Sequence, residues 1–296
     1  MSEKTPFNFG GLPKEFSDYK KAKIAVLPIP FDKTSSWQKG ADKGPRAMID
    51  ASRNVELYDI ETKSEVYKKG IFTDKPVKAA TSVLMVKKAY ERTLELLNDG
   101  KFVVALGGEH SVSVGVIKAF AKKFKDLSVL HLDAHSDRRD SYEGDKLSHA
   151  SAMARAEEII KDVVPSAEET AKDVISVGIR SMDSSELKSI KQDKIFYAEE
   201  IRKSKDWIKK ATDKLSKNVY ITIDLDVFDP SIMPSTGTPE PGGLDWYQVI
   251  DLLKEVSLRK NIVGFDVVEL MPTANKAPDF LAAKLIYKLL SYKFSL

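Results

Sequence analysis

Residues 128–137 read SVLHLDAHSD, a short apolar run that ends in a cluster of aspartate and histidine. The first five of these residues predict a β-strand, because the run is short, apolar and bounded by polar groups. Two other runs end in the same way: Phe102–Leu106 precedes GGEHS at 107–111, and Val219–Ile223 precedes DLDVFDP at 224–230. Continuously apolar strands are typical of a parallel sheet that is covered on both faces. The three segments therefore predict buried strands that end in reactive side chains.

Strand-like runs alternate with helix-length segments through much of the chain. Asp245 fits an N-cap, and apolar residues between Trp246 and Leu253 follow at helical spacing. Gly44 and Pro45 fit the start of another helix. This alternation predicts an α/β protein with a mostly parallel sheet and helices on both faces. The other predicted strands are Lys23–Pro28, Asp173–Val177, Lys194–Tyr197 and Asn261–Val267, and the other predicted helices are Ala80–Leu97 and Trp207–Leu215.

No linker, repeat or low-complexity tract divides the chain, so we expect a single domain over residues 1–296. Residues 51–75 mix the spacing of strands with that of helices, and they support neither assignment.

The composition excludes several classes of function. Lys plus Arg number 47 and Asp plus Glu 44, and this near balance gives no reason to expect a nucleic-acid partner. The chain has no cysteine, which excludes disulfides, zinc–thiolate sites and thiol nucleophiles. No apolar run is long enough to span a bilayer, and the N-terminus lacks the pattern of a signal peptide. We therefore expect a cytoplasmic protein with neither a membrane nor a nucleic-acid partner.

The polar clusters after the strands predict a metal centre. Ligands of open parallel sheets bind at the carboxyl ends of the strands, so one place would receive His110, His135, Asp133, Asp137, Asp224 and Asp226. Four carboxylates repel one another there unless cations are present. Carboxylate and imidazole without sulfur favour Mn²⁺, with Co²⁺, Ni²⁺ or Fe²⁺ as substitutes. Two ions about 3.5–4 Å apart would use all six donors. We interpret His131 as a buried residue that supports this site.

Each cluster has an ordinary interpretation when it is considered alone. A D-x-H-x-D sequence also occurs as a polar strand end, and Asp is common in loops and helix caps. The conjunction favours the metal centre, because three of the four histidines lie in polar motifs that follow strands.

The three motifs GGEHS, DAHSD and TIDLDVFDP stand in the order found in arginases and agmatinases, and the chain resembles this ureohydrolase family. Smaller matches at residues 40–49, 177–181, 237–244 and 265–272 extend the resemblance over most of the chain. It implies a three-layer α/β/α sandwich around a parallel sheet, with two Mn²⁺ ions and a small guanidino substrate. It also implies a homo-trimer or homo-hexamer.

The resemblance implies a role for each site residue by position. One metal would be held by His110, Asp133, Asp137 and Asp224, and the other by Asp133, His135, Asp224 and Asp226. Glu269 matches the glutamate that holds the guanidinium, and His149 matches the histidine that shuttles protons. We expect a hydroxide that bridges the metals to attack the guanidinium carbon, with Asp137 orienting it and transferring its proton.

The loop at residues 138–149 narrows the choice of substrate. It contains no Asn and ends in a segment similar to that of agmatinases. Agmatine, cleaved to putrescine and urea, is therefore preferred. The alternatives are arginase, guanidinobutyrase, aminopropylagmatine ureohydrolase and formiminoglutamase. Candidates for the distal ammonium are Asp140, Glu143, Asp145 and Asp183. Arg138 and Arg139 could pair with a carboxylate, so a substrate with a carboxylate at its far end remains an alternative.

Two other classes of function are less favoured. Non-catalytic relatives typically lose several ligands, whereas this chain keeps all six, which argues against a metal-stabilised binding protein. A dinuclear phosphoesterase would need Lys or Arg for the phosphate and has no use for Glu269.

Overall fold

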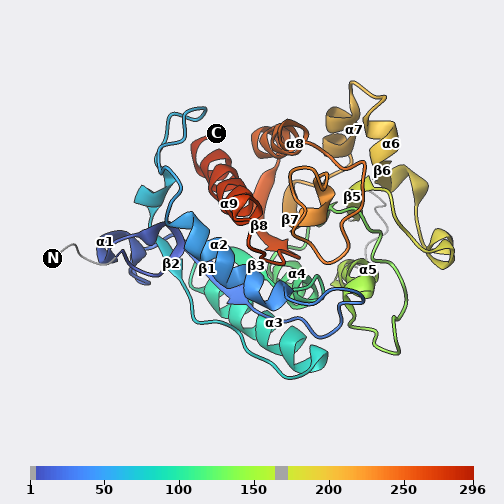
Figure 1. Ribbon diagram of the computed structural model, residues 1–296, viewed down its shortest axis with the longest axis horizontal. Coiled ribbons are helices and arrows are strands. Elements are labelled where there is room, and N and C mark those ends of the chain that lie inside the picture. Colours follow the sequence, from blue (N-terminus) through green and yellow to red (C-terminus); the bar gives the residue numbers. More distant parts are fainter. Residues whose placement is uncertain (1–4, 164–172) are drawn as a thin grey trace.

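The centre of the computed structural model, which describes residues 5–163 and 173–296, is an eight-stranded sheet (Figure 1). The strand order is β2-β1-β3-β8-β7-β4-β5-β6, and every pairing is parallel. The strands are β1 Ile24–Ile29, β2 Ile71–Thr73, β3 Phe102–Gly107, β4 Leu127–Leu132, β5 Val174–Ile179, β6 Ile195–Tyr197, β7 Asn218–Asp224 and β8 Asn261–Val268.

Helices cover both faces of this sheet (Figure 1). Residues of α2, α7, α8 and α9 pack in one apolar core, and residues of α3, α4 and α5 pack in another. Strand β1 separates the two cores, because Ile24 and Val26 belong to the first and Ala25 and Leu27 to the second. The helices are α1 Lys14–Ser17, α2 Gly44–Ser52, α3 Ser82–Asn98, α4 Val112–Lys123, α5 Ala152–Val163, α6 Ala198–Ile201, α7 Trp207–Asp213, α8 Trp246–Arg259 and α9 Ala277–Ser295.

The predicted α/β/α architecture with a parallel sheet is confirmed, and all seven predicted strands are present. Asp245 caps α8 through a reciprocal pair of hydrogen bonds with Gln248, and Pro45 lies in the first turn of α2. Strand β2 was not predicted, because its three residues at the sheet edge are too few to show a period. The single domain over residues 1–296 stays a prediction, since part of that range lies outside the described residues.

Strand order decides where the motifs meet. Strands β3, β8, β7 and β4 are neighbours at the middle of the sheet; the three polar motifs follow β3, β4 and β7, and Glu269 follows β8. Their carboxyl ends share one edge because the strands are parallel. Within residues 5–163 and 173–296, no helix has both the length and the apolar character to cross a membrane.

Candidate active site

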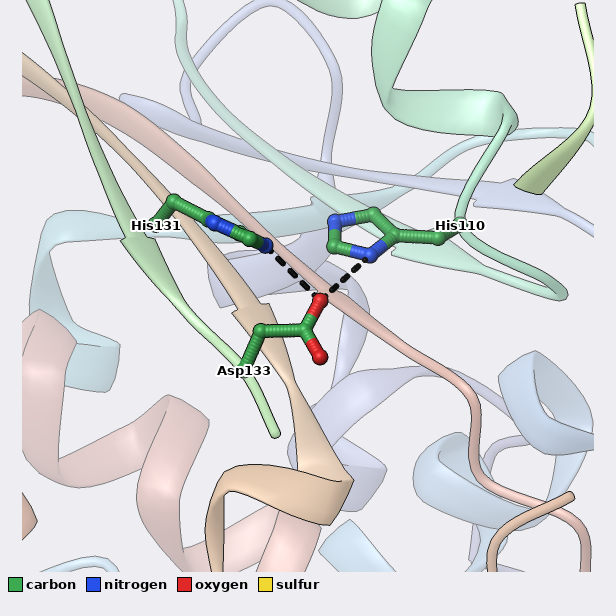
Figure 2. A group of neighbouring side chains, drawn as sticks. All are labelled: His110, His131 and Asp133. Atoms are coloured by element: carbon green, nitrogen blue, oxygen red, sulfur yellow. Dashed lines mark hydrogen bonds and ion pairs between the residues drawn. The ribbon is translucent and has the colours of Figure 1, made fainter. Parts of the chain in front are cut away.

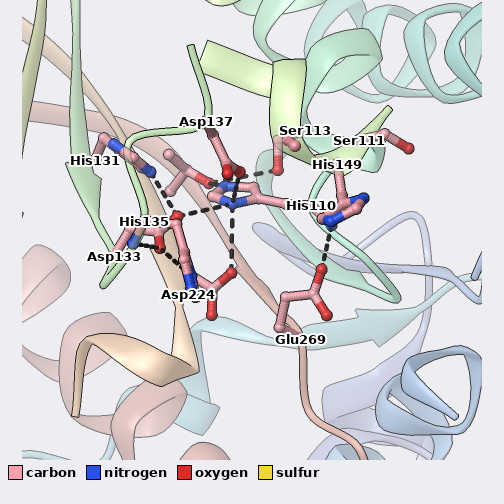
Figure 3. Close-up of polar contacts among 12 residues, drawn as sticks. His110, Ser111, Ser113, His131, Asp133, His135, Asp137, His149, Asp224 and Glu269 are labelled. Atoms are coloured by element: carbon pink, nitrogen blue, oxygen red, sulfur yellow. Dashed lines mark hydrogen bonds and ion pairs between the residues drawn. The ribbon is translucent and has the colours of Figure 1, made fainter. Parts of the chain in front are cut away.

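The structure brings the six predicted metal ligands together at this edge of the sheet, with His149 and Glu269 beside them. Figure 3 shows all of these residues except Asp226 with labels. They come from segments that are far apart in the sequence but follow adjacent strands. His110 lies between β3 and α4, the DAHSD residues follow β4, Asp224 ends β7, Glu269 follows β8, and His149 lies just before α5.

His110 faces three carboxylates in the buried part of the site. Its Nδ1 atom lies 3.1 Å from Asp133 Oδ2, 3.2 Å from Asp137 Oδ2 and 3.4 Å from Asp224 Oδ2. This Nδ1 is buried and has no hydrogen-bond partner among the described residues. The other ring nitrogen, Nε2, lies 2.9 Å from the hydroxyl of Thr222. In a neutral ring this nitrogen would direct a lone pair at three acidic oxygens, an arrangement that a metal ion satisfies.

His135 forms a second group beside the first. Its Nδ1 lies 2.8 Å from Asp226 Oδ2 and 3.6 Å from Asp133 Oδ1, so Asp133 faces both imidazoles. Backbone N–H groups orient the carboxylates: Ala134 donates to Asp226 Oδ1, and Asp226 donates to Asp224 Oδ1, both at 2.9 Å. The free carboxylate oxygens and imidazole nitrogens are therefore left facing one another.

The electrostatics of this cluster favour a bound cation. Burial, together with the charges of Asp226 and Asp133, raises the pKa of Asp224 well above its usual range. Burial and the charge of Asp133 raise the pKa of Asp137 to about 6. Burial lowers the pKa of His135, but Asp226 and Asp133 outweigh it and raise this pKa to about 12. Such a donor set attracts positive charge, and its oxygen and nitrogen atoms fit divalent metal ions.

Glu269 and Asp137 both have a left-handed backbone, with φ of 65° and 53°. Non-glycine residues seldom adopt this conformation, and strained residues of this kind cluster at functional sites. Oε1 of Glu269 accepts a hydrogen bond from the backbone N–H of His110 at 2.8 Å. Burial and the neighbouring charge of Glu109 raise the pKa of Glu269 well above its usual range. The carboxyl group therefore lacks a cationic partner among the described residues.

His149 borders the same cavity. Its backbone N–H donates to Thr34 Oγ1 at 2.9 Å, and its Nδ1 lies 3.4 Å from the same hydroxyl, which donates to Glu109. Burial and the positive charges of His110 and His135 lower the pKa of His149 to about 4. The ring is thus neutral at pH 7, and it can accept a proton there.

A cavity of about 220 Å³ opens above these residues, which is a volume suited to a small molecule. Asp137, His149, Asp224 and Glu269 line it on the side of the sheet. The remaining lining comes largely from loops and includes Trp37, Arg139, Tyr142, Met182, Asp183 and Glu186.

Of the residues considered for the far end of a substrate, Asp183 and Arg139 line the cavity. Arg139 Nη1 lies 3.5 Å from Asp183 Oδ2. Arg138 is buried instead, and its guanidinium donates to Glu157. The other three loop carboxylates do not line the cavity: Asp140 pairs with Arg155 and Lys146, Asp145 accepts from Ser82, and Glu143 is exposed.

Trp37 and Glu186 also line the cavity and were not identified from the sequence. Trp37 is 70% exposed, although it is a large aromatic residue within a polar stretch. That contrast was the available signal for a binding surface. Glu186 is buried, and one of its oxygens accepts from the backbone N–H of Arg138. No feature of the local sequence distinguished it from the other acidic residues.

His131 lies behind the site and is fully buried, as predicted. Figure 2 shows its ring and that of His110 directed at one carboxylate, and the shared atom is Asp133 Oδ2. His131 Nε2 lies 2.7 Å from this oxygen. Burial lowers the pKa of His131 to about 4, and the ring is therefore neutral.

Comparison with known proteins agrees with this geometry. A family model described as the Arginase family matches residues 22–291. The N(1)-aminopropylagmatine ureohydrolase of Synechocystis sp. is 35% identical over 306 residues, with 97% of this chain and 96% of that protein covered. The protein of the same name from a strain of Thermus thermophilus is 36% identical over 281 residues, with 93% and 92% covered.

A solved structure also resembles this one along nearly its whole length. The agmatine ureohydrolase of Thermoplasma volcanium superposes with a TM-score of 0.83 at 30% identity, covering 99% of this chain and 96% of that one. The chain therefore belongs to the arginase family and is a hydrolase of guanidino compounds.

Proposed function

We propose that this protein is a dinuclear manganese ureohydrolase that cleaves a guanidino compound with a cationic tail into urea and an amine. The observation that carries the proposal is the cluster of two imidazoles and four carboxylates beside Glu269, a half-buried residue whose carboxyl group lines the same cavity. Enzymes of the arginase family depend on a binuclear metal centre. A protein that only bound metal would not need a further carboxyl group, that of Glu269, beside the metal centre.

The two groups of donors divide the metal ligands. His110, Asp133, Asp137 and Asp224 would hold one ion, and Asp133, His135, Asp224 and Asp226 the other. When bound, the ions supply a water nucleophile with a pKa low enough for attack near neutral pH. Asp133 and Asp224 would contribute to both ions, because each faces residues of both groups.

Glu269 would hold the substrate guanidinium. Its Oε1 is already fixed by the N–H of His110, which limits rotation of the side chain. A guanidinium beside it would provide the missing cationic partner and favour the ionised carboxylate. Fixing the planar group in this way would present its central carbon to the nucleophile.

Two residues would move protons. Asp137 lies in the buried cluster, and its raised pKa suits a carboxylate that takes a proton from the nucleophile and passes it to the leaving nitrogen. His149 is neutral at pH 7 and borders the cavity, so it would accept a proton from the site and release it to solvent.

A cationic tail on the substrate is supported by the charged side chains of the loops that line the cavity. Two carboxylates of the lining loops, the partly exposed Asp183 and the buried Glu186, outnumber the single guanidinium of Arg139. Arg139 is paired with Asp183, so it is a weak site for a substrate carboxylate. N1-aminopropylagmatine is our first candidate for the substrate, because two N(1)-aminopropylagmatine ureohydrolases are 35% and 36% identical to this chain. Agmatine is the second, supported by the solved agmatine ureohydrolase.

A direct test is release of urea by the Mn²⁺-loaded protein from N1-aminopropylagmatine, agmatine, arginine and guanidinobutyrate. We expect the highest kcat/KM with an amine-tailed substrate. Highest activity with guanidinobutyrate would contradict the proposed tail. No urea from any of the four, with two ions bound, would contradict the proposed enzyme and favour a binding protein. Hydrolysis of a phosphate ester instead would favour a phosphoesterase.

A further inference from the structure

A row of buried polar side chains leads from a loop to Asp133. His131 in β4 and Ser176 in β5 are paired neighbours in the sheet, and His131 Nδ1 lies 2.9 Å from Ser176 Oγ. On the other side of the hydroxyl, Arg138 donates to Ser176 Oγ at 3.0 Å. At the opposite end of the row, His131 Nε2 lies 2.7 Å from Asp133 Oδ2. All four side chains are buried.

The direction of each hydrogen bond in this row follows from which groups can accept. A guanidinium has no acceptor, so Arg138 donates to Ser176. The single proton of the Ser176 hydroxyl is then free to point at His131 Nδ1, which accepts it with its lone pair. An ionised carboxylate can only accept, so the 2.7 Å contact with Asp133 Oδ2 places a proton on His131 Nε2, and Nδ1 is left to accept from Ser176.

This order decides between two roles for His131. Its Nε2, His110 Nδ1 and a carboxylate oxygen of Asp133 are close enough together to hold a metal ion, and a ligand role is therefore geometrically open. A protonated Nε2 has no lone pair for a metal. The proton order makes His131 a donor to the carboxylate.

We infer that His131 is a positioning residue: it fixes Asp133 for the metal ions through an N–H bond, and Arg138 and Ser176 fix its tautomer. This inference rests on the proposed metal centre. Oδ2 of Asp133 lies 3.1 Å from His110 Nδ1, so the bond from His131 leaves its remaining lone pair directed toward the site (Figure 2). Arg138 is fixed in turn by Glu157 at 2.8 Å and by the backbone oxygen of Ser136 at 3.1 Å.

The test compares His131→Leu, which removes the donor, with His131→Gln, which retains an N–H donor. Mn²⁺ affinity is measured by titration calorimetry, and the number of ions by metal analysis after equilibrium dialysis. We expect His131→Leu to bind two ions at saturation with affinity lowered about 10- to 100-fold, as for other residues that support metal ligands. His131→Gln should recover most of that loss, and Ser176→Ala should show a smaller one.

Two measurements on the unmodified protein keep the inference testable if a variant does not fold. Pulsed EPR of the Mn²⁺ protein should show nitrogen couplings from two imidazoles. ¹⁵N NMR of the metal-free protein, which has four histidines, should show His131 with its proton on Nε2. Three coordinated imidazoles, a proton on Nδ1, or loss of one ion at saturation in His131→Leu would overturn the donor role. Unchanged affinity in His131→Leu would do the same. If the unmodified protein binds no Mn²⁺, the proposed metal centre itself fails.

Discussion

Glu269 Oε1 and the backbone N–H of His110 are joined by a 2.8 Å hydrogen bond across the ends of neighbouring strands β8 and β3. A second bond strengthens the link, because the Glu269 N–H donates to the carbonyl of Gly108 at 2.8 Å. Gly108 also lies close to the backbone of Phe31, where a Cβ would collide with the carbonyl oxygen of that residue. The backbone at residues 108–110 therefore positions both Glu269, proposed to hold the substrate, and His110, a proposed metal ligand.

Replacing Glu269 separates substrate binding from metal binding. In Glu269→Gln the hydrogen bond from His110 is retained while the negative charge is lost. We expect kcat/KM to fall about 100-fold or more, because the guanidinium loses its fixed orientation. Metal analysis should still find two ions per chain. Wild-type rates of urea release in this variant would show that the substrate is held elsewhere.

Removing a carboxylate shared by both metal groups should abolish metal binding as well as turnover. Asp224→Ala eliminates a side chain that faces His110 at 3.4 Å and accepts from the Asp226 N–H. We expect loss of bound Mn²⁺ on dialysis and no detectable urea. Asp140→Ala is the control, because Asp140 is an exposed loop residue that does not line the cavity. Two tightly bound ions in Asp224→Ala would contradict the ligand assignment.

His149 should affect the rate of turnover without affecting the metal. The His149→Asn variant loses the group that we propose accepts a proton, and kcat should fall about 100-fold or more. KM and metal content should change little, since His149 lies outside the two carboxylate groups. Steady-state kinetics with metal analysis of the same sample measures both. A variant that loses an ion would place His149 among the ligands instead.

Motifs that directly follow strands were predictable from the sequence, because the strands carry them to a shared edge. Asp133 and Asp224 illustrate this, because each lies within one residue of a strand end. The two strands are neighbours in the sheet, so the two side chains meet. Arg138 and Arg139 illustrate the limit. They are neighbours in one loop, yet the first is buried and donates to Glu157 and Ser176, whereas the second lines the cavity. A loop has no side-chain period, so its packing alone decides which residue faces the substrate.

The charge of Asp183, which lines the cavity, should affect how tightly an amine-tailed substrate binds. Asp183→Asn removes one negative charge from a side chain that is 40% exposed, and the effect is therefore reduced by solvent. We expect KM for N1-aminopropylagmatine to rise about twofold to fivefold with little change in kcat. Glu143→Gln is the matched control, an exposed loop residue that does not line the cavity. An equal rise in KM in both variants would indicate only a general charge effect.

Glu61 should contribute to stability in a pH-dependent way. Lys288 contacts it at 2.6 Å, Lys254 at 2.7 Å and the Tyr292 hydroxyl at 2.6 Å, which ties its loop to α8 and α9. Burial raises the pKa of Glu61, but these hydrogen bonds outweigh it and lower the pKa from 4.5 to about 2. Because the folded pKa lies below the ordinary value, the stabilisation is complete above pH 4.5 and is lost as the pH falls toward 2.

The corresponding variant is Glu61→Gln, compared with the unmodified protein by urea unfolding at pH 7 and pH 3. At pH 7 we expect the free energy of unfolding to fall by about 1 kcal/mol, a value kept small because the side chain is 37% exposed. The difference should be smaller at pH 3, where the stabilisation by the carboxylate is partly lost. Glu91→Gln is the control, since Glu91 forms only an exposed pair with Lys87 at 3.9 Å. A difference between Glu61→Gln and the unmodified protein that is the same at both pH values would mean that Glu61 acts through packing and not through its charge.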